Sequence, residues 1–135
     1  MNNKEINFKE KQWLHYQNLD HVYCPALKSI VKFNSDGFYH MINKTNRRRR
    51  TAKSQHSRLA LIPLIKPTIK LARKINETRI EEKKMLNGQK IVTCYALIAR
   101  VGKDMCPVKV IIRKISNGSY FFHSIMRLNT KKHPD

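Results

Sequence analysis

The chain has 135 residues, of which 41% are hydrophobic and only four are Gly and five Pro. This composition excludes a disordered chain and predicts a single folded domain over residues 1–135, frayed at 1–8 and at 128–135. Its 28 Lys and Arg against 9 Asp and Glu give a formal net charge of +19, which predicts a polyanionic partner: nucleic acid, or alternatively an anionic membrane surface.

Neither a membrane-spanning run nor a signal peptide is evident in the sequence, because residues 1–19 lack an apolar stretch. We therefore expect a cytoplasmic protein that does not bind membranes. The three cysteines, Cys24, Cys94 and Cys106, lack the paired spacing of a disulfide framework or a zinc site. They are expected to be buried structural thiols, and no cofactor is predicted.

The N-terminal half is predicted to be largely helical. Residues 9–19 are expected to form a short helix anchored by apolar side chains, and residues 30–33 a short strand. A second helix is expected to begin at Ser35 or Asp36, because short side-chain oxygens cap the first turn of a helix.

A basic connector at residues 44–50, KTNRRRR, is too charged to be buried and precedes a longer helical segment. Ser54 is expected to cap that segment, whose apolar side chains recur every three or four residues. Pro63 and Pro67 are expected to split or kink it, because each removes a backbone amide donor. Residues 73–84 are expected to continue as helix or loop.

The C-terminal half is predicted to form strands. Residues 91–101, 108–115 and 120–126 are rich in β-branched and aromatic residues, and Asn117-Gly118 predicts a tight type I′ hairpin between the last two. The predicted fold is therefore α+β, with N-terminal helices packed on one face of a C-terminal antiparallel sheet of three to four strands.

A two-residue hairpin loop decides which side chains share a face, because directly opposed residues lie on the same side of a sheet. The predicted apolar face consists of Val108, Val110, Ile112, Phe121 and Ile125. The predicted outer face consists of Lys109, Ile111, Arg113, Tyr120, Phe122, Ser124 and Met126. Cations, aromatic rings and a hydroxyl on one face are typical of a surface that holds phosphate and stacks bases, and a solvated sheet face is the alternative. The same register turns His123 toward the helices, as a histidine of the core.

The order of these patterns resembles that of a known family. V-Y-C-P-A-L at 22–27 and F-N-S-D-G-F-Y-H at 33–40 precede the Arg cluster, the apolar helix, and the strands V-K-V-I-I-R-K-I and Y-F-F-H-S-I. Over about residues 22–127 the chain is similar to the barnase/EndoU/colicin-D/RelE-like (BECR) ribonuclease superfamily, and within it to toxins of phages and mobile elements. The resemblance implies metal-independent RNA cleavage on the sheet face and an antitoxin or immunity protein as partner, which the charge excess predicts to be acidic.

The family pattern implies catalytic roles for His40, which matches a helix-borne histidine, and for Ser124, which matches a hydroxyl position in the last strand. A structural histidine is the alternative for His40. No acidic residue corresponds to the Glu base of barnase-type members. Because guanidinium and ammonium groups neutralise phosphate, Arg50, Lys109 and Arg113 are also expected to be catalytic, with Arg50 chosen from four consecutive arginines at 47–50, any of which could reach the phosphate. A solvated run of charges is the alternative for these four. The expected nucleic-acid-binding residues are Arg47, Arg48, Arg49, Arg58, Tyr120 and Phe122.

The inventory of ionisable groups favours chemistry without a metal. The nine acidic residues are scattered and none lies between residues 108 and 126, whereas metal-dependent nucleases cluster carboxylates. Metal-free cleavage needs a base for the 2′-hydroxyl and an acid for the 5′-oxygen, and histidine titrates near neutrality. We therefore expect a metal-independent endoribonuclease. The alternatives are a non-catalytic basic nucleic-acid-binding module and a degenerate nuclease fold that serves in a complex.

Overall fold

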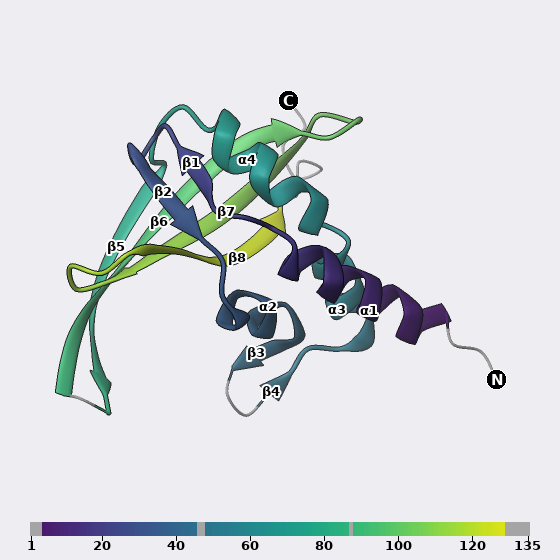
Figure 1. Ribbon diagram of the computed structural model, residues 1–135, viewed down its shortest axis with the longest axis horizontal. Coiled ribbons are helices and arrows are strands. Elements are labelled where there is room, and N and C mark those ends of the chain that lie inside the picture. Colours follow the sequence, from purple (N-terminus) through teal and green to yellow (C-terminus); the bar gives the residue numbers. More distant parts are fainter. Residues whose placement is uncertain (1–3, 46–47, 87, 129–135) are drawn as a thin grey trace.

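The computed structural model describes residues 4–45, 48–86 and 88–128, and its architecture is α+β, as predicted (Figure 1). The elements in chain order are α1 (Lys4–Gln17), β1 (Val22–Cys24), β2 (Ser29–Lys32), α2 (Ser35–Ile42), β3 (Asn43–Thr45), β4 (Arg48–Arg49), α3 (Ala52–Leu59), the 3₁₀ helix η1 (Ile62–Leu64), α4 (Ile65–Leu71), β5 (Glu77–Met85), β6 (Gly88–Val101), β7 (Cys106–Ile115) and β8 (Tyr120–Arg127).

The main sheet has six strands in the order β1-β2-β8-β7-β6-β5. The predicted number of three to four antiparallel strands was therefore too low. It is also mixed, because β2 pairs parallel to β8 while the other neighbours are antiparallel. A separate two-stranded sheet joins β3 to β4 within the basic connector.

Strand β5 contradicts the prediction of helix or loop for residues 73–84. It pairs with β6 along nine positions, from Glu77 opposite Ala96 to Met85 opposite Gly88. Its composition is polar because it is an edge strand, and charged side chains on an edge strand discourage pairing with other chains. Figure 1 shows β5 and the start of β6 extending beyond the other strands as a long curved hairpin.

The helices also differ in detail from the sequence expectations. Helix α1 already begins at Lys4, so residues 4–8 are helical rather than frayed. Thr51, not Ser54, caps α3, and its hydroxyl accepts a hydrogen bond from the Ser54 amide at 3.1 Å. The two prolines do split the next segment, with Pro63 in η1 and Pro67 in the first turn of α4.

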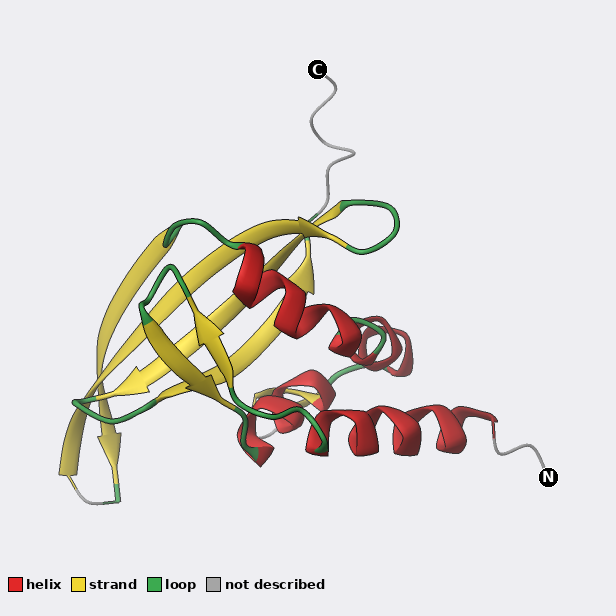
Figure 2. Ribbon diagram, turned by 45° about the horizontal axis from the view of Figure 1, so that its top comes forward, coloured by secondary structure: helices red, strands yellow, loops and turns green. Residues whose placement is uncertain are grey.

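The core lies between the helices and one face of the sheet. Figure 2 shows α4 lying across the sheet, and α4 contacts β6, β7 and β1. Its Ile65 and Ile69 are fully buried and belong to the same apolar cluster as Leu97 of β6 and Ile112 of β7. Each helix in the described ranges is too short or too polar to cross a membrane.

A β-bulge in β8 changes the predicted faces. At the turn end of the hairpin Ile112 opposes Phe122, whereas beyond the irregularity Ile111 opposes Ser124, so His123 is the extra residue. Near the turn, the pairing of β7 with β8 is shifted by one residue from the predicted register. The shift arises because the turn has its residue of positive φ at Ser116 (51°), one residue before the predicted Asn117-Gly118 pair. The bulge therefore moves His123 off the core face.

Phe122, predicted to lie on the outer face, is instead 1% exposed in the core. Tyr120 lies two residues before Phe122 in the same regularly paired part of β8, where it opposes Lys114, so the two side chains are on the same face of the sheet. The Tyr120 side chain also packs against the core. Neither aromatic ring is therefore placed to stack an RNA base on the outer face, which corrects that prediction for both residues.

Candidate active site

Two histidines from different elements meet beside β8. His40 lies in the last turn of α2, and its ring centroid is 4.0 Å from that of His123, with the ring planes at 58°. His123 reaches this position because it is the extra residue of the bulge. The imidazole pair is therefore a product of tertiary structure and of one local irregularity in a strand.

Helix α2 is held against β8 by a close approach at Gly37. Strand β2 pairs with β8 only as far as Lys32 opposite Phe121, and the chain then leaves the sheet and enters α2, which contacts β8. A Cβ atom at Gly37 would lie 2.6 Å from Phe122 Cδ2 and 3.0 Å from the Phe122 carbonyl oxygen. Only glycine allows this separation, and it brings the next turn of α2, with His40, to the bulge.

Two arginines are fixed next to this pair by hydrogen bonds to the backbone. Arg50 Nε donates to the His40 carbonyl oxygen at 3.0 Å, and the Arg50 amide donates to the Ile42 carbonyl oxygen at 2.8 Å. Arg58 Nη1 donates to the Ile125 carbonyl oxygen in β8 at 2.9 Å. Each guanidinium keeps further donors, so these contacts orient the arginines while leaving N–H groups for an anion.

The surrounding charge acts on both imidazoles in the same direction. Burial, followed by the proximity of His40, Arg113 and Lys83, lowers the pKa of His123 from 6.5 to about 3. Burial, followed by Arg113 and Arg50, also lowers the pKa of His40, and Asp36 opposes this only partly. Both imidazoles are therefore neutral at pH 7 in the free protein, within a cationic cluster that an anion would stabilise.

A groove of about 400 Å³ lies next to His123 on the outer face of the sheet. Its cationic lining includes Lys109 and Arg113 from β7 and Lys83 from β5, and Ile111 and Met126 are among its apolar side chains. Side chains of β5 and β8, which are separated by two strands in the sheet order, line the same space because the sheet is strongly curved. Arg113 Nε is buried and has no hydrogen-bond partner within the described residues.

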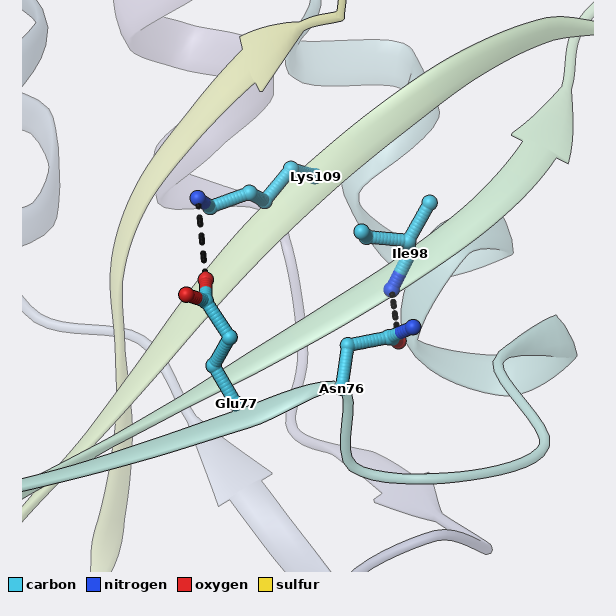
Figure 3. A network of polar contacts seen from close by, with 4 residues as sticks. All are labelled: Asn76, Glu77, Ile98 and Lys109. Atoms are coloured by element: carbon cyan, nitrogen blue, oxygen red, sulfur yellow. Dashed lines mark hydrogen bonds and ion pairs between the residues drawn. The ribbon is translucent and has the colours of Figure 1, made fainter.

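Among the groove cations, Lys109 alone forms an ion pair within the part of the chain that the structure describes. Its Nζ lies 3.3 Å from Glu77 Oε1, as Figure 3 shows, so part of its charge is neutralised within the protein. Beside this pair the Asn76 side chain accepts a hydrogen bond from the Ile98 amide at 3.1 Å, which extends the attachment of β5 to β6. Arg113 is therefore a stronger candidate than Lys109 for direct contact with phosphate.

The structure brings together part of the predicted set. His40, Arg50 and Arg58 lie around the β8 bulge, and Lys109 and Arg113 line the adjoining groove. Ser124 follows the bulge and pairs with Ile111. Arg48 and Arg49 are exposed in β4 and line, with Arg50, a separate hollow of about 390 Å³. Arg47 lies outside the described residues.

Sequence reasoning missed the contribution of β5 and misplaced His123. Glu77, Arg79, Glu81 and Lys83 all line the groove, and they alternate along β5 with the period of two that marks one face of a strand. The alternation could have indicated a strand, but the high charge of this run favoured the prediction of helix or loop. Cys94 also lines the groove, so of the three free thiols only Cys24 is fully buried.

The described residues contain no group of three His, Cys, Asp or Glu side chains arranged to hold a metal ion. Comparisons with protein-family models, with curated proteins and with solved structures give no significant match. The functional proposal therefore rests on the site and on the resemblance of the sequence patterns.

Proposed function

We propose that this protein is an endoribonuclease that cleaves RNA without a metal ion, through attack of the 2′-hydroxyl on the neighbouring phosphate. The observation that carries the proposal is the contact between His40 and His123 inside a cluster of cations beside a groove. The resemblance to BECR ribonucleases supports the same function, because it implies that RNA is cleaved on the sheet face. A cytoplasmic location is part of the proposal, because residues 1–19 lack the apolar stretch of a signal peptide.

In this proposal His40 takes the proton from the 2′-hydroxyl, because its imidazole is neutral at pH 7. The oxygen attacks phosphorus, the bond from phosphorus to the 5′-oxygen breaks, and a 2′,3′-cyclic phosphate forms. Arg113 and Arg50 stabilise the charge that develops on the phosphate oxygens. A bound phosphate raises the pKa of both imidazoles, so that the pair can return a proton to the 5′-oxygen.

Cleavage in the presence of a chelator tests this proposal. We expect RNA fragments with 2′,3′-cyclic or 3′-phosphate ends, and His40→Ala should lower turnover by about 10²- to 10⁴-fold while leaving RNA affinity nearly unchanged. His15→Ala is the matched control, because His15 is exposed in α1. Activity that appears only when magnesium is added, or a His40→Ala enzyme with normal turnover, would contradict the proposal.

The second candidate function is RNA binding without catalysis. It is favoured by the low pKa of His123, which is typical of an imidazole that stays neutral and structural. Intact RNA after prolonged incubation, together with tight binding that Arg113→Ala weakens, would select this candidate.

We further propose an acidic protein partner that covers the groove and the cations around it. The net charge of +19 and the unpartnered Arg113 Nε support it, because a carboxylate could satisfy that donor. Expression of the wild-type chain alone should slow growth of the host, whereas the His40→Ala variant should not. Normal growth with a full yield of active wild-type protein would count against the partner.

A further inference from the structure

A further hollow shares Met126 with the groove as a lining residue. It has a volume of about 560 Å³ and lies between α3 and the end of β8. Its lining consists of His56, Ser57, Arg58, Ala60, Leu61, Met126 and Arg127. Because Met126 lines both spaces, the hollow and the groove adjoin, and a single extended ligand could occupy both.

The hollow contains a flat aromatic surface. The His56 ring stacks on the Phe8 ring of α1 with a centroid separation of 4.2 Å and an interplanar angle of 22°. Phe8 is half-buried and His56 is exposed, so Phe8 fixes the orientation of a ring that stays open to solvent. Stacked aromatic surfaces of this kind bind nucleobases with little dependence on sequence, because every base has a flat π face.

Cations flank this aromatic surface on the side of β8. Arg58 is held by its hydrogen bond to the Ile125 carbonyl oxygen, and the exposed Arg127 lies in the same lining. Neither arginine forms an ion pair within the described residues. Two positive side chains beside an exposed ring match the chemistry of a nucleotide, in which a base is joined to a phosphate.

We propose that the hollow is a base-binding subsite, in which an unpaired RNA base stacks on His56 while its phosphate contacts Arg58 near Met126. This inference rests on the proposed function for the identity of the ligand, and it defines the substrate as single-stranded RNA that reaches beyond the groove. A duplex does not fit, because its bases are stacked inside the helix and must be splayed out to meet a side chain.

Binding to strands that cannot be cleaved tests the subsite independently of catalysis. The probe is a fluorescent 2′-O-methyl RNA octanucleotide, which lacks the attacking hydroxyl, compared with an abasic strand of the same backbone length. By anisotropy, His56→Ala should bind the base-bearing strand about 5- to 100-fold more weakly than the wild type. On the abasic strand the two proteins should bind equally. His56→Tyr should retain binding, and His15→Ala should match the wild type on both strands.

Equal weakening of both strands by His56→Ala would overturn the subsite, because the loss would then come from charge or folding rather than from stacking. Unchanged binding to both strands would overturn it as well. The experiment distinguishes failure of the proposed function from failure of the subsite. If RNA with free 2′-hydroxyls stays intact but His56→Ala still weakens binding of the base-bearing strand alone, the subsite stands and cleavage is disproved. Cleavage without that difference would overturn the subsite and leave the proposed function standing.

Discussion

At the scale of single residues, burial and the neighbouring cations oppose protonation of the imidazole pair. His40 and His123 sit among Arg50, Arg113 and Lys83, and the carboxylate of Asp36 opposes the pKa shift of His40 only in part. A histidine whose charged form is disfavoured by burial and by like charges responds strongly to an added anion. Phosphate binding and protonation of the pair should therefore be coupled.

The lowered pKa of His123 predicts how the stability of the protein depends on pH. The pKa of His123 is about 3 in the folded protein and near 6.5 in the unfolded chain, so between these values the unfolded chain binds more protons. The free energy of unfolding should therefore be fully retained above pH 6.5 and fall as the pH decreases toward 4.5, by at most about 1.4 kcal/mol per pH unit for that proton. Urea unfolding at a series of pH values measures this slope.

The matched variant for that measurement is His123→Asn, which should give a shallower slope between pH 6.5 and 4.5. An octanucleotide that occupies the site should also reduce the slope for the wild type, because its phosphate stabilises the protonated imidazole. A wild-type slope equal to that of His123→Asn would show that His123 is not held neutral.

At the scale of elements, the site depends on two departures from regular structure. The bulge in β8 leaves His123 and Ser124 between the buried residues Phe122 and Ile125, so that strand β8 presents an imidazole beside Arg113. The glycine in α2 lets that helix approach the same strand, where β2 no longer pairs. Both features are backbone arrangements that place side chains, and a small change in either should disturb the imidazole contact.

Substitution of Gly37 tests the role of the close approach. In Gly37→Ala the new methyl group would collide with Phe122 and with the Tyr16 hydroxyl, both of which belong to buried residues. Overpacking of this kind costs about 1–3 kcal/mol, and relief requires α2 to move away from β8. We expect a lower midpoint in urea unfolding and a loss of turnover at temperatures where the variant is still folded.

Ser35→Ala is the control for that experiment, because Ser35 is exposed in the first turn of the same helix. It should behave as the wild type in both measurements. A Gly37→Ala protein with normal stability and normal turnover would show that the separation between α2 and β8 is not critical.

At the scale of the whole molecule, positive charge and sheet curvature act together. The curvature lets side chains of β5 and β8 line one groove, and α4 covers the opposite face of the sheet (Figures 1 and 2). The groove, the imidazole pair and the hollow beyond Met126 therefore lie on connected surface rather than on separate faces. A strand of RNA that follows this surface would place several phosphates near cations.

The salt dependence of RNA affinity measures how many phosphates are contacted. If about five phosphates lie on the protein, the slope of log affinity against log salt concentration should be roughly −3.5 for a single strand. Arg58→Ala should reduce the magnitude of that slope by about 0.7, and Lys103→Ala, in the exposed turn between β6 and β7, should not change it. A slope near zero would mean that the net charge of +19 serves another purpose.

Local patterns in the chain were enough to predict the α+β class, the helix α2, the break at Pro63 and Pro67, and the strands β6 to β8, because each depends on local periodicity or on local backbone chemistry. Arg50 and Arg113 were expected from the chemistry of phosphate and His40 from the family resemblance, and their roles in the site stay predictions. That His123 faces Arg113 and that Phe122 is buried follows instead from tertiary structure. The register of a hairpin depends on the geometry of its turn, and one extra residue in a bulge reverses the faces on either side of it.

Strand β5 shows the same limit at longer range. Its charged residues carry little local signal for a strand, and they adopt one because β6 offers an unpaired edge for nine consecutive residues. That pairing brings Glu77 to Lys109, a contact between residues 32 positions apart, and it brings Lys83 to the imidazole pair. Side chains this distant meet only through the order and curvature of the sheet, which no local pattern encodes.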